Sequence, residues 1–182
     1  MKEHESECCA GLHGLPSSSL STAGVFIMDF RIQGLSPAPF IDLYGRSDED
    51  LASRNAKRYI ANAKPGFPDR IELRDVEPGE SVILVNHMHQ PANTPYRASH
   101  AIFVREGAEK AYTAVNEIPL VLQMRPISVR AFGSNHWMLD ADACAGQDLD
   151  VLIQKFLSNP AVDYLQAHFA KPGCYAACID RV

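Results

Sequence analysis

The sequence has no run of basic residues and no long apolar run. Its 17 Lys and Arg are outnumbered by 22 Asp and Glu, which gives a formal net charge of −5. Nucleic-acid backbones and anionic membrane surfaces bind clustered basic side chains, and a membrane-spanning helix needs about 20 apolar residues in succession. We therefore expect neither a nucleic-acid partner nor a membrane partner.

Motifs of known cofactor and nucleophile sites are also missing. There is no Gly-rich phosphate loop, no dinucleotide-binding fingerprint and no nucleophile elbow. The N-terminal stretch has neither the basic start nor the apolar segment of a secretory signal. The five Cys are an odd number in a chain too long to need disulfides. These features predict a cytoplasmic protein with free thiols.

Residues 1–27 differ from the rest of the chain in composition and in apolar periodicity. They are polar, rich in Ser and Gly, and have neither helical nor strand periodicity, so we expect a disordered tail. Cys8 and Cys9 lack the spacing of metal ligands. Periodicity begins at Met28, and one hypothesis is that Met28 is the native translation start, so that the tail is not made. Residues 28–182 are expected to form a single globular domain.

Apolar periodicity after Met28 predicts about eight strands and three short helices. The clearest strand is 81–89, which is apolar on both faces in its first half and therefore central. Helices are expected at 51–56, 108–115 and 149–157, and a short strand at 70–73. Hairpins are expected at 127–143 and 162–179. Because strands and helices do not alternate regularly, we predict an α+β fold with a mixed, mainly antiparallel sheet.

Several motifs in this region carry a resemblance to a known family. They are Pro78-Gly79-Glu80, His89-Gln90-Pro91, Pro95-Tyr96-Arg97-Ala98-Ser99, Ile102-Phe103-Val104-Arg105 and Lys171-Pro172-Gly173-Cys174-Tyr175-Ala176, with Asp180-Arg181 at the end. Together they resemble the bacterial family classified as domain of unknown function 1203. The resemblance runs from about Asp29 to the C-terminus. It implies no activity, because that family has none assigned.

His87 and His89 form the first group that could carry chemistry. Residues two apart on a strand project from one face, so both imidazoles could reach one divalent metal ion. A third ligand would have to come from His100, His168 or Cys174. The alternative is that both histidines end a buried strand and bond to backbone or water. The cofactor, if there is one, is otherwise unknown.

The loop and strand from Pro95 to Glu106 form the second group. Arg97 and Arg105 could clamp a carboxylate or phosphate, with Tyr96 stacking on the ligand and His100 beside it. The alternative is that these arginines pair with local acids on an exposed face.

Cys174 and His168 form the third group, a possible nucleophile and base. A three-residue hairpin loop would pair Ala170 with Cys174 and place His168 on the same face as Cys174. A two- or four-residue loop would place the two side chains on opposite faces. The alternative role for Cys174 is a small apolar side chain in the core.

Asp140 and Asp142 suggest a carboxylate pair, but we expect both to be explained by cross-strand pairing with Arg130.

The leading functional hypothesis is a small-molecule site for an anionic ligand, which could carry enzymatic activity at a His/Arg/Cys cluster. It requires His89, Arg97 and His168 to converge on one open pocket. The competing hypothesis is a non-catalytic binding or interaction domain whose polar residues hold loops in place. The sequence predicts neither the ligand nor the oligomeric state.

Overall fold

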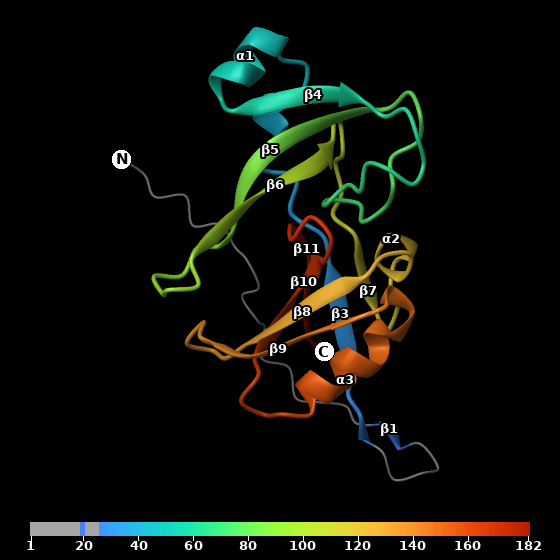
Figure 1. Ribbon diagram of the computed structural model, residues 1–182, viewed down its shortest axis with the longest axis vertical. Coiled ribbons are helices and arrows are strands. Elements are labelled where there is room, and N and C mark those ends of the chain that lie inside the picture. The colour runs from blue at the N-terminus through green and yellow to red at the C-terminus, as the bar shows by residue number, and fades with distance from the viewer. Residues whose placement is uncertain (1–18, 21–25) are drawn as a thin grey trace.

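The computed structural model describes residues 19–20 and 26–182 of the chain (Figure 1). The predicted disordered tail lies almost entirely outside these residues, as do Cys8 and Cys9. Two short strands, β1 (Ser19–Leu20) and β2 (Phe26–Ile27), pair with each other antiparallel.

Two further sheets make up most of the described structure. The larger one has six strands in the order β7 (Thr113–Val115), β3 (Phe30–Gln33), β11 (Tyr175–Arg181), β10 (Tyr164–Phe169), β8 (Ile127–Phe132) and β9 (Met138–Cys144). The smaller one has the order β4 (Ala56–Ile60), β5 (Ser81–Gln90) and β6 (Ala98–Arg105). Neighbouring strands in both sheets are antiparallel.

Three short helices accompany the sheets. They are α1 (Asp48–Ser53), α2 (Leu120–Gln123) and α3 (Leu149–Leu157), and there are two 3₁₀ turns, η1 (Ile41–Leu43) and η2 (Gly146–Asp148). The predicted α+β class with a mainly antiparallel sheet is confirmed, and β5 is the central strand of its sheet as expected. Within the described ranges, no helix is long and apolar enough to cross a membrane.

Helix α3 covers one face of the six-stranded sheet. Its apolar side chains recur at helical spacing, so one stripe of the helix is fully buried, including Leu149, Ile153 and Phe156. This stripe packs with Val129 of β8 and Leu165 of β10 in the main core. The opposite face of β10 therefore looks towards the three-stranded sheet, and that face carries polar side chains.

The smaller sheet has its own core, and this core reaches the larger sheet. Ile83 and Ile102 pack with Phe40 and Leu51, and Tyr175 at the start of β11 belongs to the same cluster. In Figure 1 the three-stranded sheet lies above the six-stranded sheet, with β10 and β11 reaching up towards it. The boundary between the two sheets is thus a packed seam, not a flexible linker.

Two predicted elements are wrong. Residues 108–115 do not form a helix, because 113–115 pair with β3 as strand β7 and the flanking Tyr112 and Asn116 amides bond to the Ile71 and Phe30 carbonyls. Residues 70–73 do not form a strand. The surrounding segment makes only two isolated bridges, Pro68 with Asp75 and Asp69 with Phe103. In both places tertiary hydrogen bonds override the local pattern.

Local hydrogen bonds and pairing explain two further elements. The Ser47 hydroxyl accepts the Asp50 N–H at 3.2 Å and caps the N-terminus of α1. The hairpin of β8 and β9 forms as predicted. Asp148 is the N-cap residue of α3, but its side chain makes no capping hydrogen bond.

We predict that Ile153→Ala destabilises the protein by about 2–5 kcal/mol, because the side chain is fully buried and its removal leaves a cavity. Val151 of the same helix is 67% exposed and is the matched control. Val151→Ala should change the free energy of unfolding by less than about 0.5 kcal/mol. Urea unfolding of both variants measures the difference. Equal effects would contradict the assignment of the buried face.

Candidate functional site

Three of the predicted site residues meet between the two sheets. The rings of His89 and His100 stack with centroids 4.4 Å apart and an angle of 14° between their planes. The ring of His168 stands nearly perpendicular to both, at 5.1 Å from His89 and 5.5 Å from His100. Tyr175 stacks on the His89 ring at 5.1 Å. We call these four residues the histidine cluster.

A bulge in β5 helps to place His89 in this cluster. Met88 pairs with Ser99 and Gln90 pairs with Ala98, so His89 is an extra residue in its strand. His89 is only 1% exposed, whereas the His87 ring packs against Phe40 with centroids 5.5 Å apart. The two histidines thus contact different neighbours.

Hydrogen bonds fix which ring nitrogen of two histidines carries the proton. The Nδ1 of His89 lies 2.9 Å from the Gln166 amide oxygen, which can only accept, so Nδ1 of His89 is protonated. The Gln166 amide nitrogen donates back to the His89 carbonyl at 3.1 Å. The Nδ1 of His100 accepts the Tyr175 N–H at 3.2 Å, so the proton of neutral His100 is on Nε2.

Burial keeps the cluster uncharged. It lowers the pKa of His89 to about 4, against the opposing effect of the Gln166 hydrogen bond. Burial, reinforced by the charge of Arg130, lowers the pKa of His168 to about 2, although the Gly173 carbonyl nearby opposes this slightly. Burial, with the charges of Arg130 and Arg70, also lowers the pKa of His100. All three imidazoles are therefore neutral near pH 7.

The geometry does not favour a metal ion. Imidazole lone pairs lie in the ring plane, so the nearly parallel rings of His89 and His100 cannot point at one ion. In the described part of the chain, no group of three or more His, Cys, Asp or Glu side chains is arranged to hold a metal. The hypothesis that His87 and His89 share an ion finds no support in these positions.

The last hairpin settles the register that the sequence left open. The Phe169 amide bonds to the Cys174 carbonyl, and the Gly173 amide bonds back to the Phe169 carbonyl, so the loop has four residues, 170–173. Gly173 adopts the left-handed backbone conformation that this turn requires, with φ of 73°. His168 pairs with Tyr175, so His168 and Cys174 project from opposite faces. This register separates the predicted base from the predicted nucleophile.

Cys174 instead contacts Arg70. The Nη2 of Arg70 donates to the Cys174 sulfur at 2.9 Å. Its Nε donates to the Tyr175 carbonyl at 3.0 Å, Nη1 donates to the Pro68 carbonyl, and the guanidinium lies 4.8 Å from the centre of the Phe169 ring. Burial lowers the pKa of Arg70 while Cys174 and then Asp69 oppose this, and an arginine remains charged in proteins. Arg70 is therefore a buried cation.

A pocket of about 620 Å³ opens beside this pair, and we call it the seam pocket. Its lining includes three cations, Arg70, Arg125 and Lys171; the polar side chains His100 and Cys174; and apolar walls from Leu84, Phe103, Pro126 and Phe169. His100 thus belongs to both the seam pocket and the histidine cluster. No carboxylate is among the described residues that line the pocket.

The remaining predicted ligand-binding residues lie elsewhere. Tyr96 packs against Phe132 and Trp137. Arg105 makes a two-point ion pair with Glu72, at 2.8 and 2.7 Å, so its guanidinium is already occupied. Arg97 is exposed and lines neither pocket. His89 and His168 thus lie together in the buried histidine cluster, but neither of them lines either pocket, and Arg97 lies elsewhere. The expected convergence of the three side chains on one open pocket is therefore not found.

Sequence reasoning missed the cations of the seam pocket. Arg70, Arg125 and Lys171 come from three separate loops and follow no local pattern. The only local signal is that Lys171 immediately precedes the turn residues Pro172-Gly173, because hairpin loops between rigid strands often carry function.

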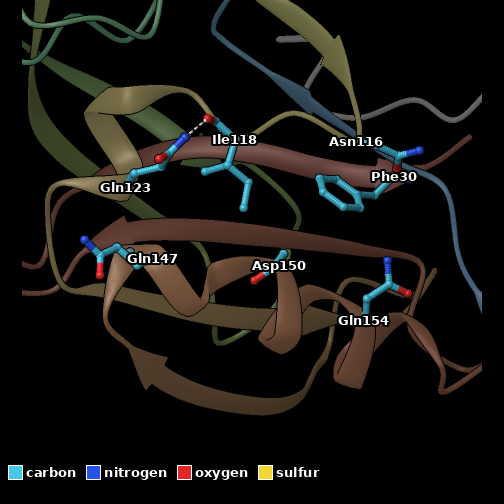
Figure 2. Close-up of a pocket in the computed structure, with 8 residues that line it drawn as sticks. Phe30, Asn116, Ile118, Gln123, Gln147, Asp150 and Gln154 are labelled. Atoms are coloured by element: carbon cyan, nitrogen blue, oxygen red, sulfur yellow. Dashed lines mark hydrogen bonds between the residues drawn. The ribbon is translucent and has the colours of Figure 1, made fainter.

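A second pocket, of about 510 Å³, is lined by residues of α2, η2, α3 and β3 and of the segment before α2. Figure 2 shows Ile118 and Gln123 on one side of it and Gln147, Asp150 and Gln154 on the other. Gln123 donates to the Ile118 carbonyl at 2.6 Å. None of the residues predicted from the sequence lines this pocket, and amides rather than cations dominate it.

Because the buried histidines are neutral in the folded protein, we predict that acid lowers its free energy of unfolding. The unfolded state takes up protons below about pH 6.5, whereas folded His89 and His168 resist protonation down to about pH 4 and about pH 2. The contribution of these two histidines to the free energy of unfolding is therefore fully present above about pH 6.5 and is lost as the pH falls. Between pH 7 and pH 5 the loss should be roughly 2 kcal/mol for each of these histidines.

Urea unfolding of wild type and His168→Gln at both pH values tests this. Any pH-independent cost of the substitution cancels, and the drop between pH 7 and pH 5 should be smaller in the variant by roughly 2 kcal/mol. An unchanged drop would show that His168 does not titrate as described.

Comparison with known proteins identifies the family. The family model described as Protein of unknown function (DUF1203) matches residues 66–181, which is well over half of the chain and includes His89, His100, His168 and Cys174. No curated protein and no solved structure matches the chain. The chain therefore belongs to the DUF1203 family of proteins of unknown function.

Proposed function

We propose that the seam pocket binds a small molecule in which an anionic group is joined to an apolar body. The observation that carries this proposal is the lining itself, in which three cations and several apolar side chains occur without a carboxylate. The volume of about 620 Å³ is in the range typical of small-molecule sites, roughly 300–1,000 Å³.

The charges of the lining support an anion. Arg125 is balanced by Asp75, which it contacts at 2.8 and 2.6 Å. Arg70 has no carboxylate among its hydrogen-bond partners in the described residues. Asp69 is next to it in sequence, but the carboxylate oxygens of Asp69 accept backbone N–H groups at 2.6 and 2.7 Å. A buried guanidinium without a bonded carboxylate favours an anionic ligand.

Lys171 adds an exposed cation at the rim of the pocket. No hydrogen bond or ion pair of its side chain occurs within the described ranges, so its ammonium is available to a ligand. The apolar walls, from Leu84, Phe103 and Phe169, would cover the body of the ligand. Each buried methylene of such a body contributes about 0.8 kcal/mol of favourable transfer free energy.

Cys174 and His100 are the pocket side chains that could take part in a reaction of the bound ligand. Once the thiol proton of Cys174 has passed to solvent, its sulfur could add to a carbonyl carbon of the ligand, with the C=O π bond breaking to an oxyanion as the S–C bond forms. Arg70 and the Nε2–H of neutral His100 would donate hydrogen bonds to the negative charge that develops. His100 cannot serve as a base through Nδ1, because this nitrogen accepts the Tyr175 N–H. Binding is therefore the primary proposal, with turnover at Cys174 as its extension.

The alternative is a non-catalytic domain with structural polar residues. The ion pair of Arg105 with Glu72 and the packing of Tyr96 favour this role for those residues. The two functions differ at Cys174. Replacement of Cys174 by Ser should leave ligand affinity in place and abolish turnover of the bound ligand, whereas a non-catalytic domain shows no turnover in either form.

We predict that small carboxylates and phosphates with an aryl or alkyl body raise the thermal midpoint of the wild-type protein at constant ionic strength. A ligand at 100 times its Kd stabilises by about 2.7 kcal/mol. Lys171→Glu should lose most of this shift, because the substitution reverses a charge at the rim. Differential scanning fluorimetry across a panel of such anions makes the measurement.

Lys110→Glu is the matched control, since Lys110 is exposed and does not line the seam pocket. It should respond to the anions as the wild type does. The proposal fails if no anion of the panel stabilises the wild type, or if both variants respond equally.

A further inference from the structure

Arg130 on β8 is a half-buried cation without an acidic partner. The sequence predicted that Asp140 and Asp142 would neutralise it, but the register of the hairpin places Ala141 opposite Arg130. Asp142 pairs instead with Lys155 of α3 at 2.8 Å. Across the described residues, no side chain makes a hydrogen bond or ion pair with the Arg130 guanidinium. Burial alone lowers its pKa, and no acid opposes the effect.

The immediate neighbours of Arg130 are polar side chains on the same face of the sheet. Arg130 pairs with Gln166 across the ladder, and Ser128 pairs with His168. Cross-strand partners project from the same face, so these four side chains face the three-stranded sheet. The alternate residues of β8, including Val129 and Ala131, point the other way into the main core.

His168 is the group in this set whose hydrogen-bonding capacity is unmet. Its side chain is 0% exposed, and neither ring nitrogen has a hydrogen-bond partner among the residues that the structure describes. Burial is the main reason for its low pKa, and the charge of Arg130 is the strongest electrostatic one. The strand pairing makes Arg130 and His168 diagonal neighbours on one face, roughly 7–8 Å apart, so both side chains can reach a shared ligand.

A count of donors and acceptors indicates the kind of ligand. Arg130 offers five N–H groups, and neutral His168 and Ser128 offer one donor each. The amide oxygen of Gln166 already accepts from His89, and the Gly173 carbonyl near His168 makes no hydrogen bond to its ring. The two ring nitrogens of His168 are the fully buried atoms of this set that lack a partner, and such groups cost about 1–3 kcal/mol each, whereas Arg130 and Ser128 are only half-buried. A group rich in lone pairs and carrying negative charge satisfies the donors and the cation together, whereas one water satisfies only part of them.

We propose that Arg130, His168 and Ser128 form a second anion site, which takes the oxyanion of a carboxylate or a phosphate on the inner face of β8 and β10. The site is separate from the seam pocket, whose lining includes none of these three residues. His100 is the nearest connection, since it lines the seam pocket and its ring lies 5.5 Å from that of His168. The inference stands independently of the function proposed for the seam pocket.

The test follows the imidazole resonances of His168 by NMR on the full chain labelled with ¹⁵N-histidine, during titration with inorganic phosphate or acetate at constant ionic strength. The expected result is a saturable shift of the His168 signals with at least one of the two anions. The anion that saturates at the lower concentration identifies the preferred chemistry. No saturable shift with either anion would overturn the proposal.

Variants locate the binding. Arg130→Gln should weaken the apparent affinity at least tenfold, and Arg130→Lys, which keeps the charge but loses the planar fork, should weaken it less. Arg54→Gln is the matched control, because Arg54 is exposed and distant in the fold, and it should bind as the wild type does. Undiminished affinity in Arg130→Gln would overturn the proposal.

Lys171→Glu separates the two proposals. The His168 response should persist in this variant, because Lys171 belongs to the seam pocket. Loss of the response in Lys171→Glu would assign the anion to the seam pocket and overturn the second site. If Arg130→Gln does not fold, Ser128→Ala gives the same test, with an expected weakening of severalfold and unchanged affinity as the contrary result.

Discussion

The buried guanidinium of Arg70 links the parts of the molecule that create the seam pocket. It bonds to the Pro68 and Tyr175 carbonyls and to the Cys174 sulfur, and it packs on the Phe169 ring. Segment 68–75 is thereby attached to the hairpin of β10 and β11. Loss of the guanidinium would leave buried carbonyls without donors, at about 1–3 kcal/mol each. The same cation therefore holds the sheets together and supplies the charge of the pocket.

Two irregularities of the strands decide which polar groups meet at the seam. The bulge in β5 makes His89 an extra residue, and a second shift between Ala167 and His168 sets His168 opposite Tyr175. Without the first shift His87 and His89 would project from one face, as a regular strand requires. The bulges therefore replace a possible pair of metal ligands with a packed group of neutral rings.

The spacing of apolar residues, alternating in strands and about every third or fourth residue in helices, was sufficient to predict the elements in which that spacing coincides with the buried face. Strand β5, the hairpin of β8 and β9, and α3 are examples. The prediction failed where tertiary contacts decide, as at 108–115, which has helical spacing but completes the sheet as β7.

The site was predicted in part for the same reason. His89, His100 and His168 stand on recognisable strands, so their meeting could be anticipated from pattern. Arg70 could not, because its partner Cys174 lies in a hairpin whose register the sequence leaves open. Arg130 was paired with the wrong residues, because a register shift between Ala131 and Phe132 places Ala141 opposite it. Arg97 was favoured only because it lies in a loop close to His89 and His100 in sequence, and nearness in sequence did not bring it to the seam.

The neutral histidines and the two proposed anion sites are connected by electrostatics. Arg70 and Arg130 flank the cluster, and both charges lower the pKa of His100. An anion beside either arginine would offset that charge and raise the pKa values of the neighbouring imidazoles. By linkage, protonation of the cluster would strengthen anion binding to the same degree. Acid would then act in two opposed ways, weakening the fold through buried imidazoles while favouring the anion-bound form over the empty one.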